Sequence, residues 1–215
     1  MSETKPEHGL APNRVEGLAD AVFAIVLTLL VIDIHAPAAH STGELAAALA
    51  DRWPDFLGYG LSFIILAIMW FGHRMEFHYI TRMDRQATLL SLLFLGTVTV
   101  IPFTASLLER NIRQPLAVAI FGMNLCLATT LRCWHWYHAS RHHRLIKRDT
   151  PEKMIKTVRR REIMVPLLYL VAAGLSALSV ALAIVVYVTI PAAYVVRASV
   201  DPALEPAFED PKSMK

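Results

Sequence analysis

Long runs of apolar residues constrain this chain more than any other feature. A helix needs about 20 apolar residues to cross the ~30 Å hydrocarbon core of a bilayer, and several stretches approach or exceed that length. Of the 215 residues, 55% are hydrophobic and only 18% are charged, whereas a soluble domain carries about 25% charged residues. These runs exceed what a soluble core of this size needs to bury. The sequence therefore predicts one membrane-embedded, all-α domain.

Six segments are predicted to span the membrane. The first four cover residues 17–34, 56–73, 87–108 and 115–137. The last apolar block, 163–196, is too long for one span at about 1.5 Å per residue, so we expect it to divide near Gly174–Ser179 into two short helices. The chain then consists of a polar N-terminal segment (1–13), a membrane domain (14–197) and a tail (198–215) that is predicted to be disordered.

The loop charges predict the orientation, because cytoplasmic loops are enriched in lysine and arginine. Most of the 21 Lys and Arg residues fall on one side of a six-span arrangement, including Lys5, Arg14, Arg74, Arg82, Arg85, the basic residues of 141–161, Arg197, Lys212 and Lys215. The other side carries Arg52, Arg110 and Arg113. Both termini are therefore predicted to be cytoplasmic, in a multi-pass protein of the cell membrane. Ala36-Pro37-Ala38 resembles a signal-peptidase site, but acidic residues precede the apolar run, so we expect a retained anchor.

The basic loop 141–161 has a composition typical of contact with anionic lipid headgroups, and nucleic acid is not expected as a partner. His135, His138 and His142 share one helical face just before it, as metal ligands would. However, no carboxylate interleaves with them and the neighbouring cations would repel a metal ion, so we expect no metal site. No catalytic constellation or cofactor motif is present, and the chain is not predicted to be an enzyme.

The first span carries the most informative polar residues. Ionisable side chains inside membrane helices are costly, so they are usually paired or functional. Asp20 lies about one turn inside the cytoplasmic end, Arg14 precedes it, and the second span returns to the same depth at Trp70 and His73. We expect these four residues to form a polar network that joins the two helices. A proton-relay or ion-binding role is the alternative.

The segment Arg14-Val15-Glu16-Gly17-Leu18-Ala19-Asp20 resembles the Arg-x-x-x-Phe-Ser-Asp signature of the endosomal/lysosomal potassium channel family. The similarity continues to Asp33, then through Trp70-x-x-His73 and Ile101-Pro102-Phe103. A single six-helix unit resembles the prokaryotic branch, whose members assemble as homotetramers. Leu18 and Ala19 replace the Phe and Ser of the signature, so the polar network lacks one hydroxyl donor.

This resemblance implies a potassium-preferring cation channel whose pore is lined by the first helix of each of four subunits. In this family bulky apolar side chains form the constriction. Ile25, Thr28, Leu29 and Ile32 recur at i, i+3, i+4 and i+7, so they share one helical face. Thr28, the only polar residue between the two aspartates, favours this face as the pore lining. Alternatively, Thr28 bonds back to a carbonyl and the face is ordinary core.

Asp33 ends the same helix at the opposite mouth, where four carboxylates around an axis would attract cations. Alternatively, Asp33 is an ordinary solvated acid at the membrane interface. Gly58-Tyr59-Gly60 resembles a conventional carbonyl filter, but it has no separate pore helix, so such a filter is not expected. Two other functions stay open: a secondary transporter or proton-coupled cation exchanger that uses Asp20 and His73, and a scaffold that transports nothing.

Overall fold

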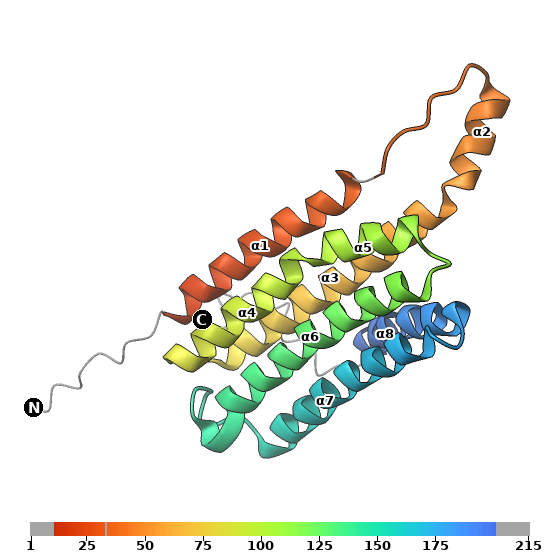
Figure 1. The fold of residues 1–215 in the computed structure, drawn as a ribbon. Helices are drawn as coiled ribbons and strands as arrows, with labels where there is room; N and C mark the ends of the chain where they lie inside the picture. Colours follow the sequence, from red (N-terminus) through yellow and green to blue (C-terminus); the bar gives the residue numbers. More distant parts are fainter. Residues whose placement is uncertain (1–10, 33, 201–215) are drawn as a thin grey trace, which may run out of the picture.

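Helices make up all the regular elements of residues 11–32 and 34–200, which this computed structural model describes, with side chains as far as Tyr194 (Figure 1). The long helices run side by side as a bundle. The elements are α1 (Pro12–Ile32), α2 (Thr42–Asp51), α3 (Trp53–Tyr79), α4 (Arg85–Thr99), α5 (Ile101–Arg110), α6 (Pro115–Ser140), the short 3₁₀ helix η1 (Arg141–His143), α7 (Glu152–Leu175) and α8 (Val180–Val200).

Four stretches of the described chain are long and apolar enough to cross a membrane: Pro12–Ile32, Trp53–Tyr79, Arg85–Arg110 and Pro115–His143. A shorter apolar helix covers Val180–Tyr194. The protein is thus a multi-pass helical membrane protein. The first half of α7 is rich in charged residues, so the fifth and sixth spans stay a prediction.

Two helices extend further than their apolar runs. α3 continues to Tyr79, beyond the predicted end at residue 73, and α6 continues to Ser140, beyond residue 137. Two of the polar side chains beyond these predicted ends are buried between helices. Glu76 is 4% exposed and His138 is 8% exposed. Because each has a partner, its polarity does not stop the helix, and hydropathy alone places both helix ends too early.

The third predicted span is broken at Pro102. α4 ends at Thr99 and α5 begins at Ile101, because proline has no N–H for the helical ladder and its ring crowds the carbonyl one turn earlier. The side-chain amide of Asn124 on α6 donates to the Thr97 carbonyl over 3.4 Å near the break. The kink is therefore stabilised by a neighbouring helix.

The last apolar block divides where the sequence predicts. α7 ends at Leu175 and α8 begins at Val180. Ser176 donates its hydroxyl to the Ala173 carbonyl over 2.6 Å, and the Leu182 N–H donates to the Ser179 hydroxyl over 3.4 Å. These bonds satisfy backbone groups that the turn would otherwise leave unpaired.

The core lies around α6, which packs against α4, α5, α7 and α8. α1 packs against α3, α4 and α5 along one edge of the bundle, on the side away from α7 (Figure 1). A second apolar cluster lies at the end of the bundle that carries the 141–151 loop. Its buried members are Val15, Phe77, Ile80, Met83, Ala87, Trp136, Ala139, Leu145, Ile146 and Ile155.

Candidate functional site

α1 has one face packed into the subunit and one face turned away from it. The packed residues follow one stripe and are at most 4% exposed: Val15, Ala19, Phe23, Val26 and Leu30. On the other side, Ile25 is 59% exposed and Ile32 is 65% exposed. Thr28 and Leu29 are exposed on the same face. The stripe selected from the sequence therefore points away from the rest of the subunit, where an axis between subunits can lie.

The Thr28 hydroxyl donates to the carbonyl of Ile25 over 2.7 Å. This is the local bond that the alternative interpretation of Thr28 anticipated. Because this bond uses the hydroxyl hydrogen, Thr28 can act toward other groups only as a hydrogen-bond acceptor. The face itself is not core, because its side chains are exposed in the subunit.

The structure brings together two of the four residues of the predicted polar network. The indole N–H of Trp70 donates to Asp20 over 2.7 Å. Arg74, which follows on α3, lies 3.7 Å from the same carboxylate. Arg14 is exposed and makes no ion pair with Asp20 among the residues described. The helix already begins at Pro12, and six residues correspond to about 1.7 turns, which places Arg14 and Asp20 on different faces.

His73 lies in an aromatic cluster and not beside Asp20. Its ring stacks on Phe77 with centroids 4.5 Å apart and on Phe94 at 5.7 Å. It is 3% exposed, and its Nε2 has no hydrogen-bond partner within the described part of the chain. His73 therefore packs as a planar ring in the core, and no hydrogen bond among the described residues links it to Asp20.

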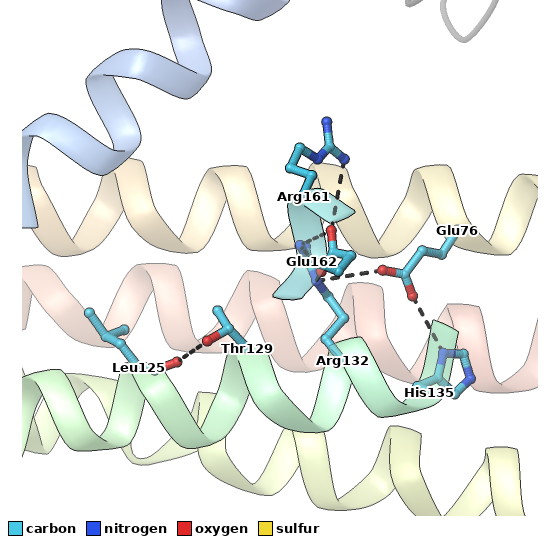
Figure 2. A network of polar contacts seen from close by, with 7 residues as sticks. All are labelled: Glu76, Leu125, Thr129, Arg132, His135, Arg161 and Glu162. Atoms are coloured by element: carbon cyan, nitrogen blue, oxygen red, sulfur yellow. Dashed lines mark hydrogen bonds and ion pairs between the residues drawn. The ribbon is translucent and has the colours of Figure 1, made fainter. Parts of the chain in front are cut away.

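The strongest polar contact inside the bundle involves residues that the sequence analysis did not select (Figure 2). Arg132 on α6 donates through Nε to Glu162 of α7 over 3.0 Å and through Nη2 over 2.6 and 2.7 Å. Arg132 is 6% exposed and Glu162 is 1% exposed. A paired, bidentate geometry is what makes a buried charge tolerable in a low-dielectric interior.

Glu76 on α3 extends this buried ion pair into a network. Its carboxylate lies 3.5 Å from Nε of Arg132, and the other oxygen lies 3.4 Å from Nδ1 of His135. The network therefore ties α3, α6 and α7 together, as Figure 2 shows. Arg132 alone carried a signal in the sequence, because an arginine inside an apolar run requires a buried acid. Nothing local indicated that Glu162, thirty residues later, is that acid.

A second polar cluster lies at the loop end of the bundle, before α4. Nε2 of His138 lies 2.9 Å from the Asp84 carboxylate, and Nη2 of Arg144 lies 3.0 Å from it. Asp84 also caps α4 by accepting the Ala87 N–H over 2.8 Å. Partial burial alone would raise the pKa of Asp84, but the Ala87 N–H, His138 and Arg144 outweigh it, so the pKa of this carboxyl lies below its ordinary value.

The three histidines weighed as metal ligands diverge. His135 faces Glu76, His138 faces Asp84, and His142 has a left-handed backbone with φ of 53° beyond the end of α6. The described residues contain no cluster of metal-ligating side chains. The Gly58-Tyr59-Gly60 segment lies inside the continuous helix α3, so its carbonyls belong to a helical ladder. Asp33 lies outside the described residues, as do positions 1–10 and 201–215.

These features define a class: a multi-pass helical membrane protein with an apolar helix on its edge and charges paired between helices. Residues 14–102 match the family described as endosomal/lysosomal potassium channel TMEM175. A potassium channel from Chamaesiphon minutus is 32% identical over 179 residues, which cover 80% of this chain and 87% of that protein. The chain belongs to the TMEM175 family.

Two further comparisons agree with this assignment. A potassium channel from Streptomyces collinus is 35% identical over 133 residues, which span 60% of this chain and 65% of that protein. The crystal structure of a lysosomal potassium-selective channel TMEM175 homolog from Chamaesiphon minutus superimposes with a TM-score of 0.77 at 27% identity. That superposition covers 87% of this chain and 97% of the other.

Proposed function

We propose that this protein is a potassium-preferring cation channel, a homotetramer whose pore is lined by α1 of each subunit. The observation that carries the proposal is the outward face of α1, with Ile25 and Ile32 more than half exposed and Thr28 between them. One helix cannot enclose a water path, so symmetric closure around an axis is required. The printed names of the two bacterial relatives support potassium as the permeant ion.

Exposed apolar residues alone do not distinguish a pore from a lipid-facing surface. α1 differs from the other three candidate membrane spans because only 28% of its apolar window is buried in the subunit, against 44% for each of the others. A helix that contacts both its own subunit and two neighbours needs this additional free surface. This difference supports α1, and not α3 or α6, as the helix at the axis.

The proposed constriction works by dehydration. Four inward Ile25 side chains form an apolar ring, and a narrow apolar ring excludes water. A permeating ion then loses part of its hydration shell without gaining protein ligands. Potassium holds its water less tightly than sodium, so its barrier is lower. The mechanism gives a modest preference for potassium and needs no carbonyl filter. Four Asp33 carboxylates at the mouth would add cation attraction.

In this proposal α7 and α8 supply the fifth and sixth spans, both termini are cytoplasmic, and the host is the cell membrane. The basic segment 141–161, which the sequence indicated as a loop and whose second half is the start of α7, then faces the cytoplasmic leaflet, where its basic side chains attract anionic headgroups. Asp20 and Trp70 hold α1 against α3 and serve assembly, not permeation. The 2.7 Å bond between them supports this structural role.

Potassium flux from potassium-loaded liposomes that contain the protein distinguishes the channel from an exchanger and from a scaffold. A channel gives large, uncoupled potassium flux that follows the potassium gradient, whether or not a pH gradient is present. A proton-coupled exchanger gives saturating flux that follows the pH gradient, and a scaffold gives none. We expect uncoupled flux from a tetramer of about four times the 24.0 kDa chain mass. Coupled flux, no flux, or full conduction by a diluted monomer would contradict the proposal.

A further inference from the structure

A cavity of about 60 Å³ lies where α3, α6, α7 and α8 converge. Each helix contributes residues at helical spacing, so the cavity is a product of the packing and not of a loop. Its lining divides by chemistry. The apolar part includes Ile65 and Ile68 of α3 and Ile190 of α8, and the polar part includes Arg161 and Tyr194.

The polar end carries a cation that the bundle does not fully use. Glu162 is engaged by three hydrogen bonds from Arg132, and Arg161 touches the same carboxylate only at 3.8 Å. Figure 2 shows Arg161 on the side of Glu162 away from Arg132. The guanidinium of Arg161 lies over the Tyr194 ring at 5.2 Å, and its side chain is 37% exposed. Arg161 is therefore held in place with donors still open to the outside.

The exposed face of α7 indicates how deep in the membrane the polar end of the cavity lies. Lys156, Arg159 and Arg160 are exposed before Arg161, whereas Ile163 and Met164 are 46% and 50% exposed just after it. A helix surface that changes from basic to apolar within one turn marks the boundary between headgroups and hydrocarbon. The cavity thus has its cation at headgroup level and its isoleucines deeper. Two of the helices that line it, α7 and α8, lie on the side of the bundle away from α1 (Figure 1).

We propose that one anionic phospholipid docks at the open end of this cavity, with its phosphate at Arg161 and the start of an acyl chain against Ile68 and Ile190. Basic pockets between membrane helices on the cytoplasmic side suit lipid headgroups. The inference deepens the proposed lipid contact of the basic segment 141–161, on which its leaflet assignment rests. It assigns the selectivity for anionic lipid to Arg161, and it does not depend on whether the protein conducts ions.

The test is native mass spectrometry of the full-length protein released from mixed phosphatidylglycerol and phosphatidylcholine. Wild-type protein should retain phosphatidylglycerol in preference to phosphatidylcholine. Arg161→Gln should lower that retention about fivefold, the factor that corresponds to about 1 kcal/mol per arginine near an anionic surface. The matched control Arg159→Gln removes the same charge from the exposed face of the same helix, and should change retention by less than twofold. Ile68→Trp fills the apolar end without changing charge and should also lower retention.

Three outcomes overturn the inference. If Arg161→Gln and Arg159→Gln lower phosphatidylglycerol retention equally, the lipid is attracted only by the summed charge of the basic segment 141–161. The proposed lipid contact of that segment is then unaffected. Equal retention of the two lipids means that the cavity does not recognise charge. Thermal stabilisation by soluble glycerol phosphate as large as that by phosphatidylglycerol means a free phosphate site and not a lipid site. Because every readout is binding, failure here is distinguishable from failure to conduct.

Discussion

Replacing Arg132 by glutamine should destabilise the bundle more than any single change on its surface. The side chain donates three hydrogen bonds of 2.6–3.0 Å to Glu162 and lies 3.5 Å from Glu76. Both carboxylates are at most 4% exposed, so they would be left buried without their cation. Breaking a buried pair in this way costs about 3–5 kcal/mol. For a domain of this size that corresponds to a fall in Tm on the order of 10 °C.

The assay is thermal unfolding in detergent at fixed protein concentration, with Arg113→Gln as the control because Arg113 is exposed. The control should stay within about 0.5 kcal/mol of wild type. The double variant Arg132→Leu with Glu162→Leu should recover part of the loss, because it removes both charges of the main pair and leaves only Glu76, which keeps its contact with His135. If Arg132→Gln melts at the temperature of the control, or if the double variant melts below Arg132→Gln, the network does not stabilise the fold as argued.

Three other changes have expected outcomes. Asp20→Ala removes the hydrogen-bond acceptor of Trp70. Because the Asp20 side chain is 41% exposed, the loss of stability in thermal unfolding should be near that of one hydrogen bond, about 1 kcal/mol. Altered ion preference with unchanged stability would contradict this. Asp84 has a lowered pKa when folded, so its stabilisation is complete above its unfolded pKa of about 3.9 and is lost as the pH falls through the lower folded value. The Tm of Asp84→Asn should therefore differ from wild type at pH 6 and converge with it in acid, and a constant difference would be the contrary result. Gly122→Ala places a Cβ against the buried phenol of Tyr187 and should cost about 1–3 kcal/mol, whereas an unchanged Tm would show that Tyr187 moves freely.

The fold was largely predictable because long apolar runs admit few structures. The kink at Pro102 and the turn before Val180 follow from local chemistry. The contacts within the polar network were less predictable. Depth alone grouped Arg14 with Asp20, but helical phase separates them, and Arg74 occupies the predicted place. Sequence hydropathy does not report which face of α1 packs inward, since both faces are apolar.

The buried pair of Arg132 and Glu162 shows a different limit. Arg132 signals a hidden acid, yet the choice among several acids depends on how α6 and α7 align. Glu162 also follows three arginines, so it reads as part of a solvated basic loop. Its burial is a tertiary property that local sequence does not contain.

The most direct test of the central claim is the reversal potential in planar bilayers with potassium on one side and sodium on the other. Wild-type channels should reverse at a potential that indicates potassium preference. Ile25→Asn wets the proposed ring, so it should raise unitary conductance and move the potassium to sodium permeability ratio toward unity. Phe23→Asn, on the packed face where Phe23 is 1% exposed, should instead reduce the yield of folded protein. Unchanged permeation in Ile25→Asn, together with altered selectivity in a folded Phe23→Asn, would show that another face of α1 lines the pore.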